Sequence, residues 1–123
     1  MSTIDALFAK LRKSGRKALM PFVTAGDPDL EFTAAVIREL VARGSSLCEL
    51  GIPYSDPIAD GPVIQASYTR ALGRHVTLAG IFEMLGRLTP DLPAPLVTMV
   101  SYSIVYRHGR RTRRRLRRRG WRG

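Results

Sequence analysis

The feature that most restricts the fold of this sequence is the stretch at residues 48–62, CELGIPYSDPIADGP. Its first residues belong to a short apolar run, residues 47–50, which is typical of a buried strand. The prolines and glycines that follow exclude a regular helix or strand and predict an ordered loop. That loop carries Ser55, Asp56 and Asp60, which are able to do chemistry or to bind a ligand. A rigid acidic loop at the end of a buried strand is a common place for the chemistry of α/β enzymes.

One carboxylate, that of Glu49, lies inside the predicted strand itself. Because strand side chains alternate, Glu49 is expected to point to one face with Leu47, and Cys48 and Leu50 to the other. No Lys or Arg lies within five positions of Glu49, and an unpaired buried carboxylate is costly. On spacing alone, a glutamate leaning into solvent explains the pattern as well as a functional acid does. The acidic loop that follows favours the functional interpretation.

Apolar periodicity elsewhere predicts strands that alternate with helices. Two further strands are expected at residues 18–24 and 96–102, where apolar and β-branched residues run together. Helices are expected at residues 2–12, 28–43, 63–72 and 78–88, with apolar residues at helical spacing. Strands and helices in this order predict βα units on a parallel sheet, which is an α/β fold.

Local signals mark the helix ends. Asp27 is the predicted N-cap of the second helix, with Pro28 at its first position, and Thr77 caps the fourth. Ser2 and Asp5 approximate a capping box for the first. On the third helix, Ile64, Tyr68, Ala71 and Leu72 are expected on one side.

Composition excludes several classes of protein. A hydrophobic content of 45% over 123 residues suits one globular domain with a single core. No run reaches the roughly 20 apolar residues of a membrane span, and no signal peptide is visible. The single cysteine, Cys48, cannot form an internal disulfide, which fits a cytoplasmic protein. No Cys/His cluster suits a metal, and the lone His75 in a turn is expected at the surface.

The net charge of +10 is concentrated at one end of the chain. Residues 1–106 hold ten basic and ten acidic residues, whereas residues 107–123 hold ten arginines and no acid. We therefore divide the chain into a neutral domain, residues 1–106, and an arginine-rich tail, residues 107–123. The tail could be a basic arm that binds nucleic acid, a solvated disordered segment, or the product of a shifted reading frame in GC-rich DNA. We favour the last, which predicts that another frame resumes the helix–strand pattern from about codon 109.

Two segments resemble the tryptophan synthase alpha chain family. They are FVTAGDP at Phe22–Pro28 and ELGIPYSDPIADGP at Glu49–Pro62, and the second is long and highly specific. The resemblance runs from the N-terminal helix to about residue 109. It departs from the family pattern at Cys48, where a branched aliphatic residue is usual, and at Ser103, where asparagine is common.

The resemblance implies a (β/α)₈ barrel that cleaves indole-3-glycerol phosphate to indole and glyceraldehyde 3-phosphate. By position, Glu49 matches the family's catalytic acid/base and Asp60 the carboxylate beside the indole nitrogen. Phe22 matches a wall of the indole pocket, and Met99 is a weaker match for another. A carboxyl group in an apolar setting can act as a general acid near neutral pH, while a wetter one stays ionised.

The resemblance also implies a partner. In the family, indole passes through a tunnel to a beta chain that holds pyridoxal phosphate, within an alpha2beta2 heterotetramer; the alpha chain itself needs no cofactor. Pro53, Asp56 and Pro57 match the loop that faces the beta chain. A complete barrel takes roughly 250 residues, and only three βα-type strands are recognisable here. We therefore expect an N-terminal barrel portion with little activity alone and an open edge at its third strand.

Overall fold

A computed structural model describes residues 1–108 of the chain. Its elements follow the predicted order: α1 (Thr3–Lys13), β1 (Phe22–Thr24), α2 (Leu30–Ala42), β2 (Cys48–Gly51), α3 (Pro62–Gly73), α4 (Leu78–Leu88), the 3₁₀ turn η1 (Thr89–Asp91) and β3 (Leu96–Met99). A further helix occupies residues 102–108. The predictions made for the tail fall almost wholly on residues 109–123, which lie outside the described residues.

The three strands form one parallel sheet in the order β1-β2-β3. The predicted parallel α/β arrangement is therefore confirmed, although two strands are shorter than expected. Residues 18–21 are excluded from β1, where Pro21 has no N–H to donate to a strand ladder. Residues 100–102 are excluded from β3 because the Ser101 carbonyl already accepts hydrogen bonds from the Ile104 and Val105 amides, which begins a helix.

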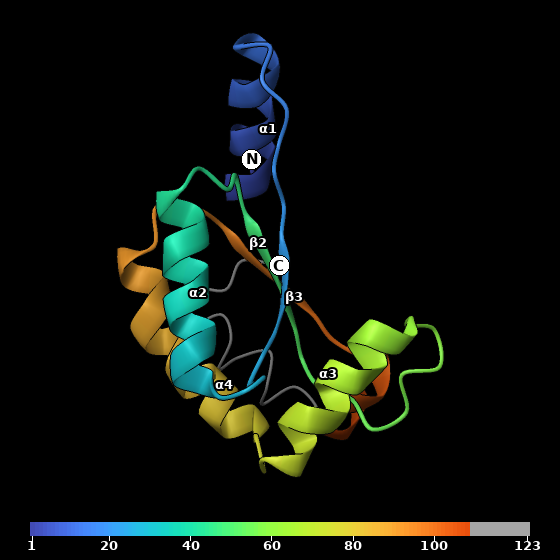
Figure 1. Cartoon of the computed structure of the whole chain (residues 1–123). Coiled ribbons are helices and arrows are strands. Elements are labelled where there is room, and N and C mark those ends of the chain that lie inside the picture. Colours follow the sequence, from blue (N-terminus) through green and yellow to red (C-terminus); the bar gives the residue numbers. More distant parts are fainter. Residues whose placement is uncertain (109–123) are drawn as a thin grey trace.

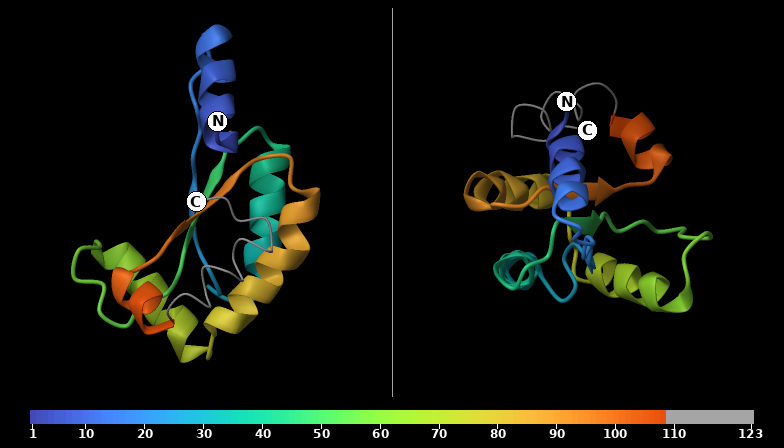
Figure 2. Two further views of the ribbon diagram at one scale, coloured as in Figure 1. Left: turned by 180° about the vertical axis from the view of Figure 1, so that it is seen from behind. Right: turned by 90° about the horizontal axis from the view of Figure 1, so that it is seen from above.

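The hydrophobic core lies between one face of the sheet and the helices α2 and α4. Figures 1 and 2 show these two helices together on one side of the strands, with α3 and the helix at residues 102–108 on the other side. Cys48 and Leu50 are fully buried in this core, whereas Glu49 between them is only half-buried. The predicted alternation of β2 is thus confirmed. Their partners in the core include Ala34, Ile37, Ile81, Met84, Leu85 and Leu88.

Helix α1 stands apart from the other helices, at the amino end of the strands (Figure 1). Ser2 and Asp5 form the predicted capping box, in which the Ser2 hydroxyl accepts from the Asp5 amide and the Asp5 carboxylate accepts from the Ser2 amide. This reciprocal pair satisfies two backbone donors that a helix start otherwise leaves free.

The predicted start of α2 is wrong by two residues. Asp29, and not Asp27, is the N-cap: its carboxylate accepts from the Phe32 amide at 2.7 Å. Asp27 instead forms a bidentate ion pair with Arg70 of α3, at 2.7 and 3.0 Å. The predicted end of α2 is confirmed, since Arg43 is the C-cap and Gly44 has a φ of 102°.

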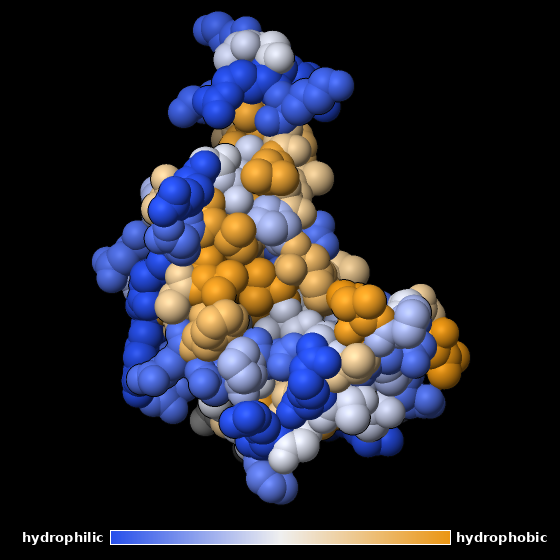
Figure 3. Space-filling model, viewed as in Figure 1, coloured by the Kyte–Doolittle hydropathy of each residue, from blue (hydrophilic) through white to orange (hydrophobic). Residues whose placement is uncertain are grey.

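The face of the sheet opposite the core is only partly covered within residues 1–108. In that part of the chain, β1 and β3 each pair on one side only, so both are edge strands. Met99 at the end of β3 is 51% exposed. Figure 3 looks towards the β1 edge of the sheet, where apolar side chains gather between α2 and the strands. Among the described helices, none has the length and apolar character needed to cross a membrane.

Candidate active site

The site begins with a row of side chains on the open face of the sheet. Phe22 of β1 pairs in register with Glu49 of β2, which pairs with Val97 of β3. Paired residues of parallel strands project to the same face, so these three side chains form one row. Met99 belongs to the next row, with Thr24 and Gly51. The structure therefore brings the predicted residues Phe22, Glu49 and Met99 together on one face.

Gly51 is the point at which the side chains above this face converge. A Cβ atom at residue 51 would overlap the ring of Phe22 and would lie 2.9 Å from the hydroxyl oxygen of Tyr68. The Phe22 ring therefore reaches across to β2, and the Tyr68 hydroxyl reaches the same place from α3. Only glycine leaves room for both groups in van der Waals contact.

The loop after β2 is ordered, as predicted. The Ile52 amide donates to the Met99 carbonyl at 2.9 Å, which ties the loop start to β3, and the next residue, Pro53, is buried. Further on, the Asp60 amide donates to the Pro57 carbonyl at 3.1 Å. The Gln65 side-chain amide donates to the Asp60 carbonyl at 2.7 Å. The backbone of Asp60 is thus held while its side chain stays exposed.

Three residues matched to a partner-facing loop differ in accessibility. Asp56 is exposed and Pro57 is half-buried, but Pro53 is buried. The side chain of Ile58, which the sequence analysis did not single out, is 87% exposed.

Asp60 acts electrostatically on a buried hydroxyl. Burial, together with the nearby negative charge of Asp60, raises the pKa of Tyr68. The sequence spacing placed Tyr68 on one side of the third helix with Ile64 and Ala71, and its side chain is buried. The sequence analysis did not predict that the Tyr68 hydroxyl lies beside Gly51. The one signal in the sequence was a tyrosine at a position where an aliphatic side chain would have been enough for burial.

Helix α3 is fixed to β1 by two contacts. The Thr24 and Ser67 hydroxyls are 2.7 Å apart and buried, and Ser67 also donates to the Ile64 carbonyl at 2.8 Å. The Asp27–Arg70 ion pair adds a second link near the same end of β1, and its hydrogen bond raises the pKa of Arg70. Of the residues expected on one side of this helix, Tyr68 and Ala71 are buried, whereas Leu72 is 37% exposed; Ser67, outside that set, is buried.

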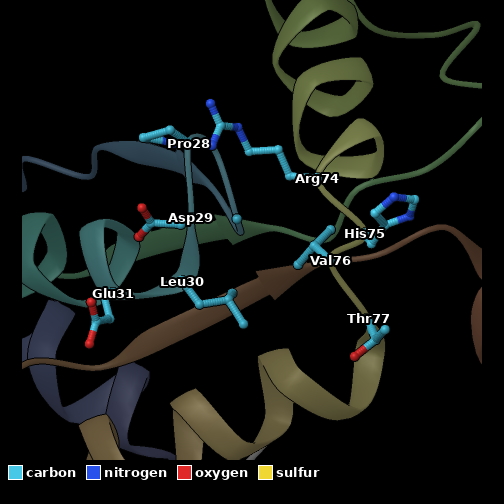
Figure 4. A pocket seen from close by; sticks show the side chains of 9 residues that line it. Pro28, Asp29, Leu30, Glu31, Arg74, His75, Val76 and Thr77 are labelled. Atoms are coloured by element: carbon cyan, nitrogen blue, oxygen red, sulfur yellow. The ribbon is translucent and has the colours of Figure 1, made fainter.

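An open cleft of about 730 Å³ lies outside this row of residues, between the start of α2 and the α3–α4 turn (Figure 4). Asp29 is the N-cap of α2 and Glu31 lies in its first turn, and Arg74, His75 and Thr77 come from the turn. His75 is exposed, as predicted, with a φ of 59°. Thr77 caps α4, as predicted, by accepting from the Gly80 amide. None of the predicted catalytic residues lines this cleft.

The other reactive groups of the described residues offer little chemistry. Cys48 is fully buried, and burial raises the pKa of its thiol, which disfavours the nucleophilic thiolate. Within residues 1–108, no three His, Cys, Asp or Glu side chains are grouped so that they could hold a metal ion.

Comparison with known proteins places this chain in a family. The family model of the tryptophan synthase alpha chain matches residues 8–119. The chain belongs to the tryptophan synthase alpha chain family. The alpha chain of Rhodopirellula baltica is 55% identical over 112 residues, which are 89% of this chain and 40% of that protein. That of Acaryochloris marina is 50% identical over 109 residues, again 89% of this chain and 41% of the relative.

Solved structures of the family agree with the fold. The alpha subunit of Legionella pneumophila has a TM-score of 0.91 at 34% identity, covering 98% of this chain and 47% of that one. Tryptophan synthase from Mycobacterium tuberculosis gives 0.92 at 29% identity, with 100% and 49% covered. The three-stranded sheet is thus the first portion of the family's TIM barrel. The chain spans about two fifths of the length of the curated relatives quoted above.

Proposed function

We propose that this chain acts in tryptophan biosynthesis, as the acid–base portion of an active site that cleaves indole-3-glycerol phosphate. The observation that carries this proposal is the placement of Glu49 on the open face of β2. It stands in register with Phe22 and one row from Met99, with the Asp60 loop at the carboxyl end of the same strand. An acid between apolar walls suits a substrate with an indole ring.

The reaction is a retro-aldol cleavage. A proton is added to C3 of the indole, and the glycerol hydroxyl next to the ring loses its proton. The bond between C3 and the glycerol carbon then breaks, its electron pair stays with the ring, and an aldehyde forms. We assign the proton transfers to Glu49 as general acid and base. The Asp60 carboxylate stabilises the positive charge that develops on the ring nitrogen.

We further propose that the loop with Pro53, Asp56 and Pro57 faces a beta chain, which holds the pyridoxal phosphate and consumes the indole. The exposure of Asp56 leaves its carboxylate accessible to such a partner. The single buried cysteine supports a cytoplasmic setting.

The test joins residues 1–108 to the remaining barrel of the Rhodopirellula baltica relative and measures release of indole from indole-3-glycerol phosphate. Glu49→Gln is expected to abolish cleavage, because no other described carboxylate lies in its row. Asp60→Asn should lower kcat by about two to three orders of magnitude, the scale for losing one positioned charge.

The matched control is Glu39→Gln, which changes an exposed glutamate on α2 and should leave turnover unchanged. Near-normal cleavage by the Glu49→Gln chimera would contradict the acid–base role. The 123-residue chain alone is expected to show little turnover, since the loops that bind phosphate in TIM barrels follow strands beyond the three described here.

A further inference from the structure

A second group, besides the predicted residues, reaches the open face of the sheet. Tyr68 is 6% exposed, yet its hydroxyl oxygen lies beside Gly51, where a Cβ atom would be 2.9 Å away. Gly51 is two residues beyond Glu49 on the same strand, and the Phe22 ring lies against it. The ring of Tyr68 is therefore buried under α3 while its polar end borders the proposed substrate site.

The position of this hydroxyl is fixed by its neighbours. The preceding residue, Ser67, is bound to Thr24 of β1 through their buried hydroxyls. Three residues before Tyr68, Gln65 donates from its side chain to the Asp60 carbonyl. Helix α3 thus both binds the backbone of Asp60 and carries the Tyr68 hydroxyl, whose pKa is raised in part by the Asp60 charge. Within residues 1–108, the Asp60 carboxylate itself accepts no hydrogen bond.

We propose that Tyr68 is a positioning residue of this site, whose hydroxyl donates a hydrogen bond to the Asp60 carboxylate when an indole ring occupies the open face. The inference rests on the proposed function. A neutral tyrosine hydroxyl beside a carboxylate can act only as the donor, and hydrogen bonds to a charged acceptor are stronger than neutral ones. This hydrogen bond orients the otherwise solvent-exposed Asp60 carboxylate towards the nitrogen of the indole ring.

The link between Tyr68 and Asp60 is tested first without substrate. In the full 123-residue chain labelled with ¹³C at the tyrosine ring, NMR follows the ionisation of all four tyrosines. One of them should titrate above the ordinary tyrosine pKa of about 10. Asp60→Asn should move that tyrosine, and no other, to lower pH, because the repulsion of a second negative charge is removed. Asp56→Asn, in the same loop, is the control.

The Tyr68→Phe variant identifies the shifted resonance by its disappearance. If Asp60→Asn left every tyrosine where it was, the proposal would be overturned. The NMR titration needs only the substitution of Asp60, which is exposed. It therefore tests the coupling between Tyr68 and Asp60 even if the Tyr68→Phe variant does not fold.

The second arm measures binding of indole by calorimetry. Tyr68→Phe should weaken binding about ten- to 150-fold, the range for one hydrogen bond to a charged group. In the Asp60→Asn background it should cause no further loss, because the hydroxyl acts through that carboxylate. The control Tyr102→Phe, at an exposed ring, should change nothing.

Additive losses in the double variant would overturn the positioning role while leaving the proposed function intact. Failure of the unsubstituted chain to bind indole would instead count against the proposed function for this chain. The NMR titration would then still decide whether Tyr68 and Asp60 are coupled.

Discussion

Gly51 shows how one residue without a side chain determines the shape of the site. Phe22 and Tyr68 come from different elements and meet at its α-carbon, so any side chain there competes with both. Gly51 has no positive φ, and its role is therefore one of space and not of backbone conformation. The glycine lets an apolar wall and a polar group border the same small volume.

Gly51→Ala is expected to destabilise the fold by roughly 1–3 kcal/mol, as overpacking of a filled space does. It should also weaken indole binding, since the added methyl group pushes the Phe22 ring and the Tyr68 hydroxyl apart. Urea unfolding measures the first effect and calorimetry the second. Gly73→Ala is the matched control, because a Cβ there meets no atom within 4 Å. Equal effects of the two substitutions would contradict the packing role of Gly51.

At the residue scale, the sequence predicted those features that depend on the spacing of residues close together in the chain. Strand alternation alone separated Glu49 from Cys48 and Leu50, and the rigid loop followed from its prolines. Asp27 was misassigned because a carboxylate before proline at a helix start is a good cap, and its competing partner, Arg70, is 43 positions away. The role of Tyr68 at Gly51 likewise depends on a contact between elements, which no local pattern contains.

At the scale of elements, α3 is the helix that positions most of the side chains around the site. Its bounds were predicted within one residue, as 63–72 against Pro62–Gly73. Its docking was not predicted, because the decisive contact is between two hydroxyls, of Thr24 and Ser67, that carry no apolar signal. Buried polar pairs of this kind fix one orientation of a helix, since any slip leaves a hydroxyl unsatisfied.

Thr24→Val is expected to lower the free energy of unfolding by about 1–2 kcal/mol, because Ser67 loses a buried hydrogen-bond partner. Denaturant titration followed by circular dichroism measures the change. Thr69→Val, on the exposed side of the same helix, removes a hydroxyl that bonds only to the Gln65 carbonyl at 2.9 Å. It should change stability by less than about 0.5 kcal/mol. A loss at Thr69 as large as that at Thr24 would argue against the docking role.

At the scale of the molecule, the parallel sheet followed from the alternation of strands and helices, because a parallel pair needs a crossover connection that a helix can supply. The unpaired edges of the sheet formed by the described strands are also a property of the whole molecule. Both outer strands present free backbone groups, and such edges pair readily with other chains. The backbone groups of Leu96 and Thr98 face the free edge of β3, because those of Pro95 and Met99 face β2.

The full chain is therefore expected to associate as its concentration rises, which sedimentation velocity detects. Thr98→Pro should reduce this association while keeping the circular dichroism spectrum, since it removes an edge N–H that β2 does not use. Val97→Pro is the matched control: its N–H points to β2, so proline there should disrupt the sheet itself. A monomer that melts cooperatively at every concentration would show that the edge of β3 is not open in solution. Association unchanged by Thr98→Pro would place the contact elsewhere on the molecule.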